Sequence, residues 1–206
     1  MYNPYNFAPG GKIVGDKSAP DGPILRLNDG GMDMQNLPIA PLLYRNVDVI
    51  IANDNSGDTP DMWPNGTALY MTSQWAKTQG LAFPSVPSPA NMVAQGLNTR
   101  PAFYGCNATS GPLIVWIPAA AGIPGADGVV NIGTVTLSVE QGLVPTFIAN
   151  GNANVLRGAG TLAAQGVPGN WPQCVACAVM QRQLVRLGNG TMPAVCQTCF
   201  SALCYS

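Results

Sequence analysis

The segment Val47-Asp48-Val49-Ile50-Ile51-Ala52 decides the fold class of this chain. It is almost entirely apolar and rich in β-branched residues, which is typical of a strand that is covered on both faces. A second segment of this kind, Pro112-Leu113-Ile114-Val115-Trp116-Ile117-Pro118, is bracketed by prolines, which cannot join a central ladder. The two segments predict buried strands of the parallel type.

Helical and irregular segments lie around these strands. Thr67 is placed to cap a helix over residues 68–77, and a further helix is predicted over residues 174–186. Residues 135–139 fit either a strand or the start of a helix that continues through 140–142. The Gly-, Asn- and Pro-rich stretches 1–22, 119–133 and 149–170 are expected to be irregular. The pattern predicts an α/β fold with a covered sheet, and one partial domain rather than two.

The amino-acid composition indicates whether the protein binds nucleic acid and whether it is glycosylated. Charged residues make up 9% of the 206 residues and the net charge is -1, against roughly 25% charged residues in a typical soluble domain. No basic stripe of the kind that binds nucleic acid is present. Three N-x-[ST] sequons, each beside turn-forming residues, indicate that glycans keep the surface soluble, and their acceptors are Asn65, Asn107 and Asn189.

A secretory route is therefore expected, although no targeting segment is visible. The first twenty residues lack a basic start and a continuous apolar core, and no apolar stretch is long enough to span a bilayer. We expect a secreted or cell-surface protein in which an N-terminal part of the same domain lies outside this sequence. The sequence does not say whether a membrane anchor follows Ser206.

The six cysteines allow two interpretations. Cys174-x-x-Cys177 and Cys196-x-x-Cys199 fit the spacing of a four-cysteine zinc ribbon, which would leave Cys106 and Cys204 over. Six cysteines also pair evenly, and the sequons favour an oxidising compartment, so three disulfides are the preferred hypothesis. The connectivity is not readable from the sequence.

The absence of histidine limits the chemistry. It excludes a Ser-His-Asp triad and nearly every histidine-dependent metal site within these residues, and no Gly-x-Ser-x-Gly elbow is present. The acidic loop at residues 53–58 fails the EF-hand pattern, because its glycine falls one place early and no glutamate follows. No metal or cofactor is predicted.

Asp29 is the remaining candidate for catalysis. The short apolar run Ile24-Leu25-Arg26-Leu27 predicts a strand that delivers this carboxylate to the turn Asn28-Asp29-Gly30-Gly31. The carboxyl end of a strand is where α/β sheets usually place their sites. An isolated Asp-Gly-Gly is more often only a turn, so the residues alone do not decide the role of Asp29.

The sequence resembles fungal phospholipase B enzymes, which are related to the cytosolic phospholipase and patatin hydrolases. The matching stretches run in order over nearly the whole chain: Asp29-Gly30-Gly31-x-Asp33-x-Gln35-Asn36-x-Pro38, Val47-Asp48-Val49-Ile50, Asp58-Thr59, Trp63-Pro64-Asn65-Gly66-Thr67, Gly96-Leu97-Asn98-x-Arg100-Pro101, Phe103-x-Gly105-Cys106-Asn107, Pro112-Leu113-Ile114-Val115, Trp171-x-x-Cys174-x-x-Cys177-Ala178 and Pro193-x-Val195-Cys196-x-x-Cys199-Phe200, then Cys204.

The resemblance implies the C-terminal part of a layered patatin/cytosolic-phospholipase-like α/β domain with a central sheet and a disulfide-stapled tail. The family uses a serine/aspartate dyad, and Asp29 takes the aspartate position. The serine belongs to a Gly-x-Ser-Gly-Gly elbow, which is expected in the N-terminal part outside this sequence. The implied substrates are lysophospholipids and phospholipids at a lipid interface.

Three hypotheses follow from the sequence. In the first, these residues belong to a lysophospholipase or phospholipase B and are inert on their own, because the serine is absent. In the second, the chain is a secreted, disulfide-bonded fragment without catalysis. The third is a four-cysteine zinc module, which the lack of a basic surface disfavours.

Overall fold

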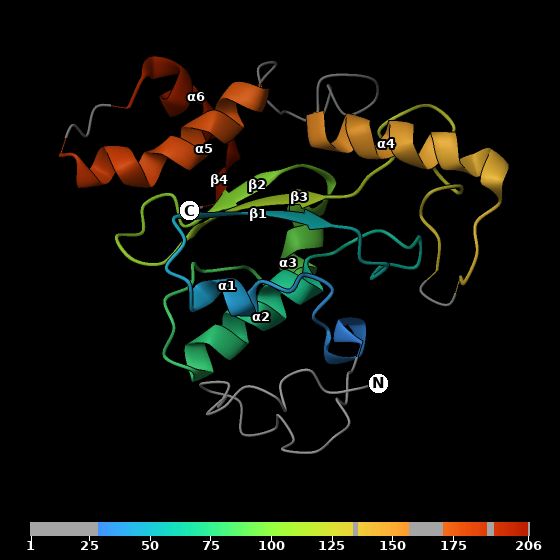
Figure 1. Cartoon of the computed structure of the whole chain (residues 1–206), viewed down its shortest axis with the longest axis horizontal. Coiled ribbons are helices and arrows are strands. Elements are labelled where there is room, and N and C mark those ends of the chain that lie inside the picture. The colour runs from blue at the N-terminus through green and yellow to red at the C-terminus, as the bar shows by residue number, and fades with distance from the viewer. Residues whose placement is uncertain (1–28, 134–135, 157–170, 189–191, 206) are drawn as a thin grey trace, which may run out of the picture. The chain divides into compact units, whose positions relative to one another are not determined.

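The computed structural model of the chain describes residues 29–133, 136–156, 171–188 and 192–205 (Figure 1). The chain divides into two compact units, Met1–Asp33 and Met34–Ser206, which are treated separately. The described part of the first unit is Asp29 with the 3-10 helix η2 (Gly30–Asp33). The strand predicted at residues 24–27 lies outside the described residues.

The second unit is built on a four-stranded sheet with the order β1-β3-β2-β4. Its strands are β1 (Val49–Asp54), β2 (Ala102–Tyr104), β3 (Leu113–Pro118) and β4 (Cys204–Tyr205). β1 and β3 are parallel, with Ile50 opposite Ile114, whereas β2 is antiparallel to β3 and parallel to β4. The two buried strands predicted from the sequence are confirmed, with β1 shifted two residues toward the C-terminus, and they are parallel neighbours. The expectation that both flanking prolines lie outside the ladder was wrong for Pro118, which is the last residue of β3 and lies opposite Asp54.

Helices cover both faces of this sheet (Figure 1). On one side lie α1 (Ala40–Leu43), α2 (Thr67–Thr78) and α3 (Pro89–Ala94), and on the other lie α4 (Val144–Leu156), α5 (Trp171–Arg186) and α6 (Ala194–Leu203). Short 3-10 turns, η3 (Leu97–Thr99) and η4 (Gln141–Leu143), precede β2 and α4. The fold is thus mixed α/β, as predicted.

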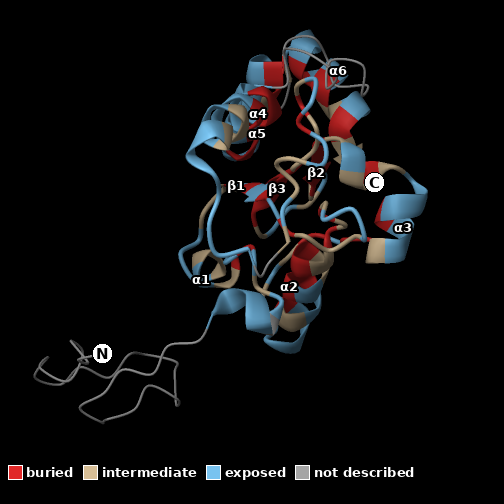
Figure 2. Cartoon of the chain, turned by 90° about the vertical axis from the view of Figure 1, so that its right-hand side faces the viewer, coloured by how far each residue is buried: buried red, intermediate tan, exposed pale blue. Residues whose placement is uncertain are grey.

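The continuous apolar character of β3 follows from these two layers. Ile114 and Trp116 pack into the core cluster that contains Leu69 of α2, whereas Leu113 and Val115 pack into the cluster that contains Cys174 of α5. Successive side chains of a strand point to opposite faces, so a strand between two helical layers needs apolar residues at every position. Figure 2 shows buried residues on the strands and on the helices of both layers.

Several helix boundaries differ from expectation. α2 begins at Thr67, and its N-cap is Gly66 in the left-handed region (φ 84°), so the prediction that Thr67 caps the helix was wrong. α5 begins three residues earlier than predicted. The described residues 136–140 form neither strand nor helix, and α4 occupies part of the stretch 149–170 that we expected to be irregular. Residues 119–133 lack helix and strand, as expected.

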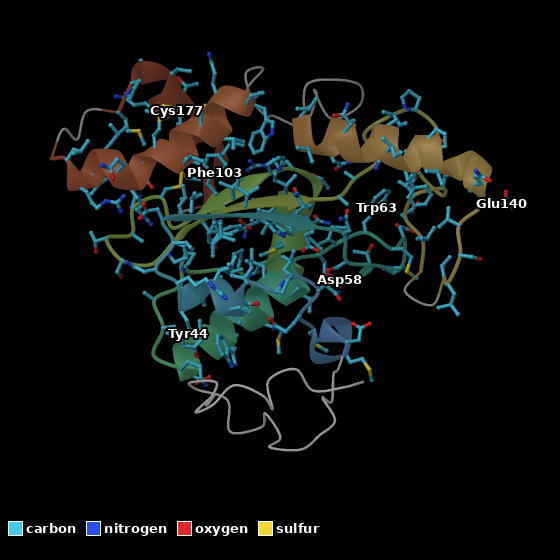
Figure 3. All side chains as sticks on the ribbon, in the orientation of Figure 1. Tyr44, Asp58, Trp63, Phe103, Glu140 and Cys177 are labelled. Atoms are coloured by element: carbon cyan, nitrogen blue, oxygen red, sulfur yellow. A yellow bond between two sulfur atoms is a disulfide. The ribbon has the colours of Figure 1, made fainter. Side chains whose placement is uncertain are left out.

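All six cysteines are paired in disulfides. Cys174–Cys199 and Cys177–Cys196 join α5 to α6, and Cys106–Cys204 ties the loop after β2 to β4 (Figure 3). The pairing corrects the zinc-ribbon hypothesis, because no thiolate remains to bind a metal. Among the described helices, none combines the length and apolar character needed to cross a membrane.

Candidate functional site

Asp29 stands immediately before η2 and shapes its first turn. The backbone N–H of Gly31 donates to Asp29 Oδ1 at 2.7 Å, and the N–H of Met32 donates to the Asp29 carbonyl at 3.1 Å. An aspartate that accepts a bond from the N–H two residues on forms a turn that the following glycines permit. The side chain of Asp29 is exposed within its unit.

The stretch after η2 belongs to the second unit, where side-chain amides hold it in place. Asn36 Nδ2 donates to Ser56 Oγ at 3.2 Å, and the hydroxyl of Thr72 on α2 donates to Gln35 Oε1 at 3.3 Å. Ser56 lies in the loop that follows β1. Residues 35–36 are thereby fixed at the carboxyl end of the central strands.

A buried carboxylate, Asp54, organises that end of the sheet. Its Oδ2 accepts from the Trp116 indole N–H at 3.0 Å, and its Oδ1 accepts from the backbone N–H of Ser56 at 3.0 Å. Its backbone carbonyl accepts from the N–H of Ala119 at 2.8 Å. A buried charge is stable only when hydrogen bonds replace its lost water, and these bonds serve that purpose while fixing both loops.

A second carboxylate, Asp58, lies in the loop after β1, next to the residues that lead into α2 (Figure 3). Burial raises its pKa, the negative charge of Asp54 adds to the rise, and the backbone N–H of Asn65 partly offsets it by donating to Asp58 Oδ2 at 3.2 Å. A carboxylate at a helix N-terminus also interacts favourably with the helix dipole. Asp58 therefore has a structural task at this turn.

The three predicted glycan acceptors differ in their surroundings. Asn65 is half-buried, and its Oδ1 accepts from both the N–H and the hydroxyl of Thr67, at 2.9 and 2.6 Å. Asn107 is exposed in the loop that carries Cys106. Asn189 lies outside the described residues.

A cavity of about 270 Å³ opens beyond the carboxyl ends of β1 and β3. Its walls are the loop after β1, the end of β3, the loop after β3 and one side of α4. Aliphatic and aromatic side chains line it together with side-chain amides. The lining residues are Asn53, Asn55, Trp63, Ile117, Ala119, Val130, Phe147, Asn150, Gly151, Asn154 and Val155. No charged side chain lines it. Such a cavity suits an uncharged group.

Two asparagines of α4 form the wall nearest the loop after β3. Asn150 accepts from the N–H of Gly122 at 2.7 Å and donates to the Ala120 carbonyl at 3.1 Å. Asn154 accepts from the N–H of Ala120 at 2.9 Å and donates to the same carbonyl at 2.8 Å. We call this pair the asparagine clamp. It was not predicted from the sequence, because residues 149–170 were expected to be irregular; the spacing of four residues, which places both side chains on one face of a helix, is the signal that could have indicated it.

Over the described ranges, no group of three or more Cys, Asp or Glu side chains gathers in a way that would hold an ion. Asp54 and Asp58 are both engaged by N–H donors. Asp29, the catalytic candidate predicted from the sequence, lies in the first unit, whereas the cavity lies in the second.

The chain matches the family model for the lysophospholipase catalytic domain over residues 3–206. It is 42% identical over 194 residues to "Lysophospholipase 2" of Aspergillus fumigatus, a match that covers 89% of this chain and 31% of the relative. It is 38% identical over 194 residues to "Lysophospholipase" of Penicillium chrysogenum (89% of this chain, 30% of the relative). It is 39% identical over 202 residues to "Lysophospholipase" of Torulaspora delbrueckii (92% and 30%).

The chain thus spans about a third of the length of these curated relatives. No solved structure matches it.

Proposed function

Because this chain belongs to the family of lysophospholipase catalytic domains, we propose that it supplies the aspartate of a serine/aspartate dyad to an enzyme that hydrolyses fatty-acyl esters of lysophospholipids and phospholipids. The observation that carries the proposal is the family match over residues 3–206, within which Asp29 opens the Asp-Gly-Gly turn. The serine is proposed to come from a segment outside these 206 residues. The complete domain is then expected to have the layered patatin/cytosolic-phospholipase-like fold.

The proposed reaction is acyl transfer in two steps. The serine Oγ attacks the acyl carbonyl carbon while its proton passes to the Asp29 carboxylate. The tetrahedral intermediate then expels the glycerol oxygen, which takes that proton from Asp29. Water attacks the acyl-enzyme, again giving a proton to Asp29, and the serine oxygen leaves with that proton as the fatty acid is released. One base thus serves both half-reactions, and no histidine is needed.

The second proposal concerns compartment. A secreted or cell-surface glycoprotein is supported by three disulfides, which persist in oxidising environments, and by an exposed sequon at Asn107. The substrate is expected at a lipid interface.

The test of the catalytic role is Asp29→Ala in the complete protein. Loss of a general base typically costs 10²–10⁴-fold, so we expect lysophospholipid hydrolysis to fall by about 10³-fold with the thermal midpoint retained. Asp61→Asn, which changes another exposed aspartate, is the matched control and should retain the rate. Equal activity of the Asp29→Ala and Asp61→Asn variants would remove Asp29 from the mechanism.

A non-catalytic, disulfide-bonded product is the alternative. The observation that favours it is the lack of a nucleophile elbow in these residues. If it is correct, the complete protein shows no hydrolysis either. If the dyad proposal is correct, residues 1–206 alone are inactive while the complete protein is active.

A further inference from the structure

The outer side of α4 carries an apolar stripe that no described element covers. Val144, Ile148 and Val155 lie on one face of the helix, at spacings of four and seven residues, and their side chains are 42%, 67% and 48% exposed. Leu156 at the helix end is also half exposed. A soluble protein rarely leaves so many large aliphatic side chains together on one helix without a partner for them.

The chain that leads into α4 also carries exposed apolar side chains. Leu137 is 97% exposed, and Val139 is also exposed, just before Glu140 at the start of η4 (Figure 3). Between residues 141 and 156 the sequence contains no charged residue. It also contains no Trp, Tyr or Arg, the residues that usually anchor protein–protein interfaces. An uncharged aliphatic surface is complementary to the acyl region of a lipid aggregate.

The stripe borders the cavity described above. Phe147 and Gly151 line that cavity and lie on the helix side next to the stripe, and Val155 belongs both to the stripe and to the cavity lining. The asparagine clamp, which also lines the cavity, fixes the adjoining side of α4 to the loop after β3. One helix therefore presents an apolar rim at the mouth of a neutral cavity, at the end of the sheet where α/β folds place their ligands.

We propose that the α4 stripe, Val144, Ile148 and Val155, is the surface by which the protein lies on a lipid aggregate. This inference rests on the proposed function, because a lipid substrate is what gives the surface its occupant. Interfacial helices often use Lys and Arg to select anionic lipids. The stripe has neither, so its binding depends on apolar contact and is insensitive to lipid charge and to salt.

The experiment compares vesicle binding and hydrolysis in the complete protein. In Val144→Ser/Ile148→Ser, we expect binding to phosphatidylcholine vesicles to fall by about tenfold per side chain, from the apolar area lost. Hydrolysis of micellar lysophosphatidylcholine should fall in parallel, whereas hydrolysis of a short-chain ester dispersed as monomers should keep its rate. The matched control, Val179→Ser/Val185→Ser, removes two exposed valines from α5 and should bind as the parent does.

Two further measurements test whether binding depends on lipid charge and whether one variant binds more strongly than the parent. Adding anionic lipid to the vesicles, or raising the salt, should leave binding unchanged. Ile148→Trp should strengthen binding, because tryptophan favours the lipid–water interface.

Three outcomes overturn the inference while leaving the proposed function intact. The first is equal vesicle binding by the stripe and control variants, and the second is binding that requires anionic lipid. The third is a stripe variant that misfolds or aggregates, together with an Ile148→Trp variant that does not bind vesicles more strongly. The last result would show that another part of the polypeptide covers α4. Failure of the proposed function is distinguishable, because the unmodified protein would then hydrolyse neither the micellar nor the monomeric ester.

Discussion

Gly66 shows how one residue fixes the start of an element near the candidate site. Its φ of 84° lies in the left-handed region, which side chains with a Cβ rarely adopt. A Cβ built there would also lie 2.0 Å from Sδ of Met92, a fully buried side chain of α3. Glycine therefore meets two demands at once: the backbone turns into α2, and α3 packs closely against that turn.

We predict that Gly66→Ala lowers the free energy of unfolding by about 2–4 kcal/mol, because it adds overpacking against Met92 to backbone strain. The sequon Asn65-x-Thr67 is kept in this variant. Gly80→Ala is the control: its φ is +67°, and no atom lies within 4 Å of the added Cβ, so it should cost only roughly 1 kcal/mol of strain. Equilibrium denaturation of both variants measures the difference, and equal costs would mean that Met92 moves aside freely.

At the scale of the element, α4 depends on its tertiary contacts more than on its composition. Asparagine and glycine are poor helix formers, yet α4 holds three asparagines and a glycine within Asn150–Asn154. Two of those asparagines, Asn150 and Asn154, are buried and bond to the backbone of residues 120 and 122. Their hydrogen bonds to the loop after β3 compensate for the poor helix propensity of these residues.

Truncating the clamp should therefore destabilise the protein. We expect Asn154→Ala to cost about 1–3 kcal/mol, because it leaves the N–H and the carbonyl of Ala120 without this partner. Asn152→Ala, which changes an exposed asparagine of the same helix, should stay within about 0.5 kcal/mol. Denaturant titration compares the two, and a double variant with Asn150→Ala should cost a different amount from the sum of the single changes, because both residues bond to Ala120.

A further contact at this scale joins α5 to the start of β1. Arg186 donates from Nη1 and Nη2 to the two carboxylate oxygens of Asp48, at 2.5 and 2.6 Å. That hydrogen bonding holds the pKa of Asp48 below its ordinary value, slight burial opposes the shift, and the charges of Arg186 and Arg182 assist it. The pair is exposed, so its contribution to stability is modest and screened by salt.

The sign of the pH effect follows from the lowered pKa. The stabilisation is present above the pKa that Asp48 has in the unfolded chain and is lost as the pH falls through the lower folded pKa. We expect Asp48→Asn to lower the thermal midpoint at about pH 7 and to make little difference at about pH 2. Thermal melts at both pH values test this expectation, with Asp61→Asn as the exposed control. A difference between wild type and Asp48→Asn that persists at the lower pH would contradict it.

At the scale of the whole molecule, the sequence predicted the elements that carry a long, uniform signal. β3 is apolar at every position because it is covered on both faces, and α5 is long enough for its apolar residues to indicate a helix. β2 was missed because three residues between Pro101 and Gly105 are too few to show a period. The clamp was missed because Asn150 and Asn154 act through tertiary bonds that oppose local propensity.

The disulfide connectivity was likewise beyond sequence reasoning, because it depends on which faces of α5 and α6 meet. Cys174 and Cys177 are three residues apart on α5, and Cys196 and Cys199 are three apart on α6. Residues at this spacing share one helix face, so two disulfides form side by side between the same two helices. The third, Cys106–Cys204, spans 98 residues and fastens the two-residue strand β4 beside β2.

These disulfides should therefore contribute unequally. In the chain-entropy model, Cys106–Cys204 restricts a long loop even when the other two bonds remain, so Cys106→Ala/Cys204→Ala should cost about 4 kcal/mol. Cys177→Ala/Cys196→Ala leaves Cys174–Cys199 joining α5 to α6, so only a short loop is released and the cost should be about 2 kcal/mol. Denaturant unfolding of both double variants under oxidising conditions gives the comparison. A larger loss in the α5–α6 variant would mean that packing between those helices, rather than closure of the chain, is what the disulfides protect.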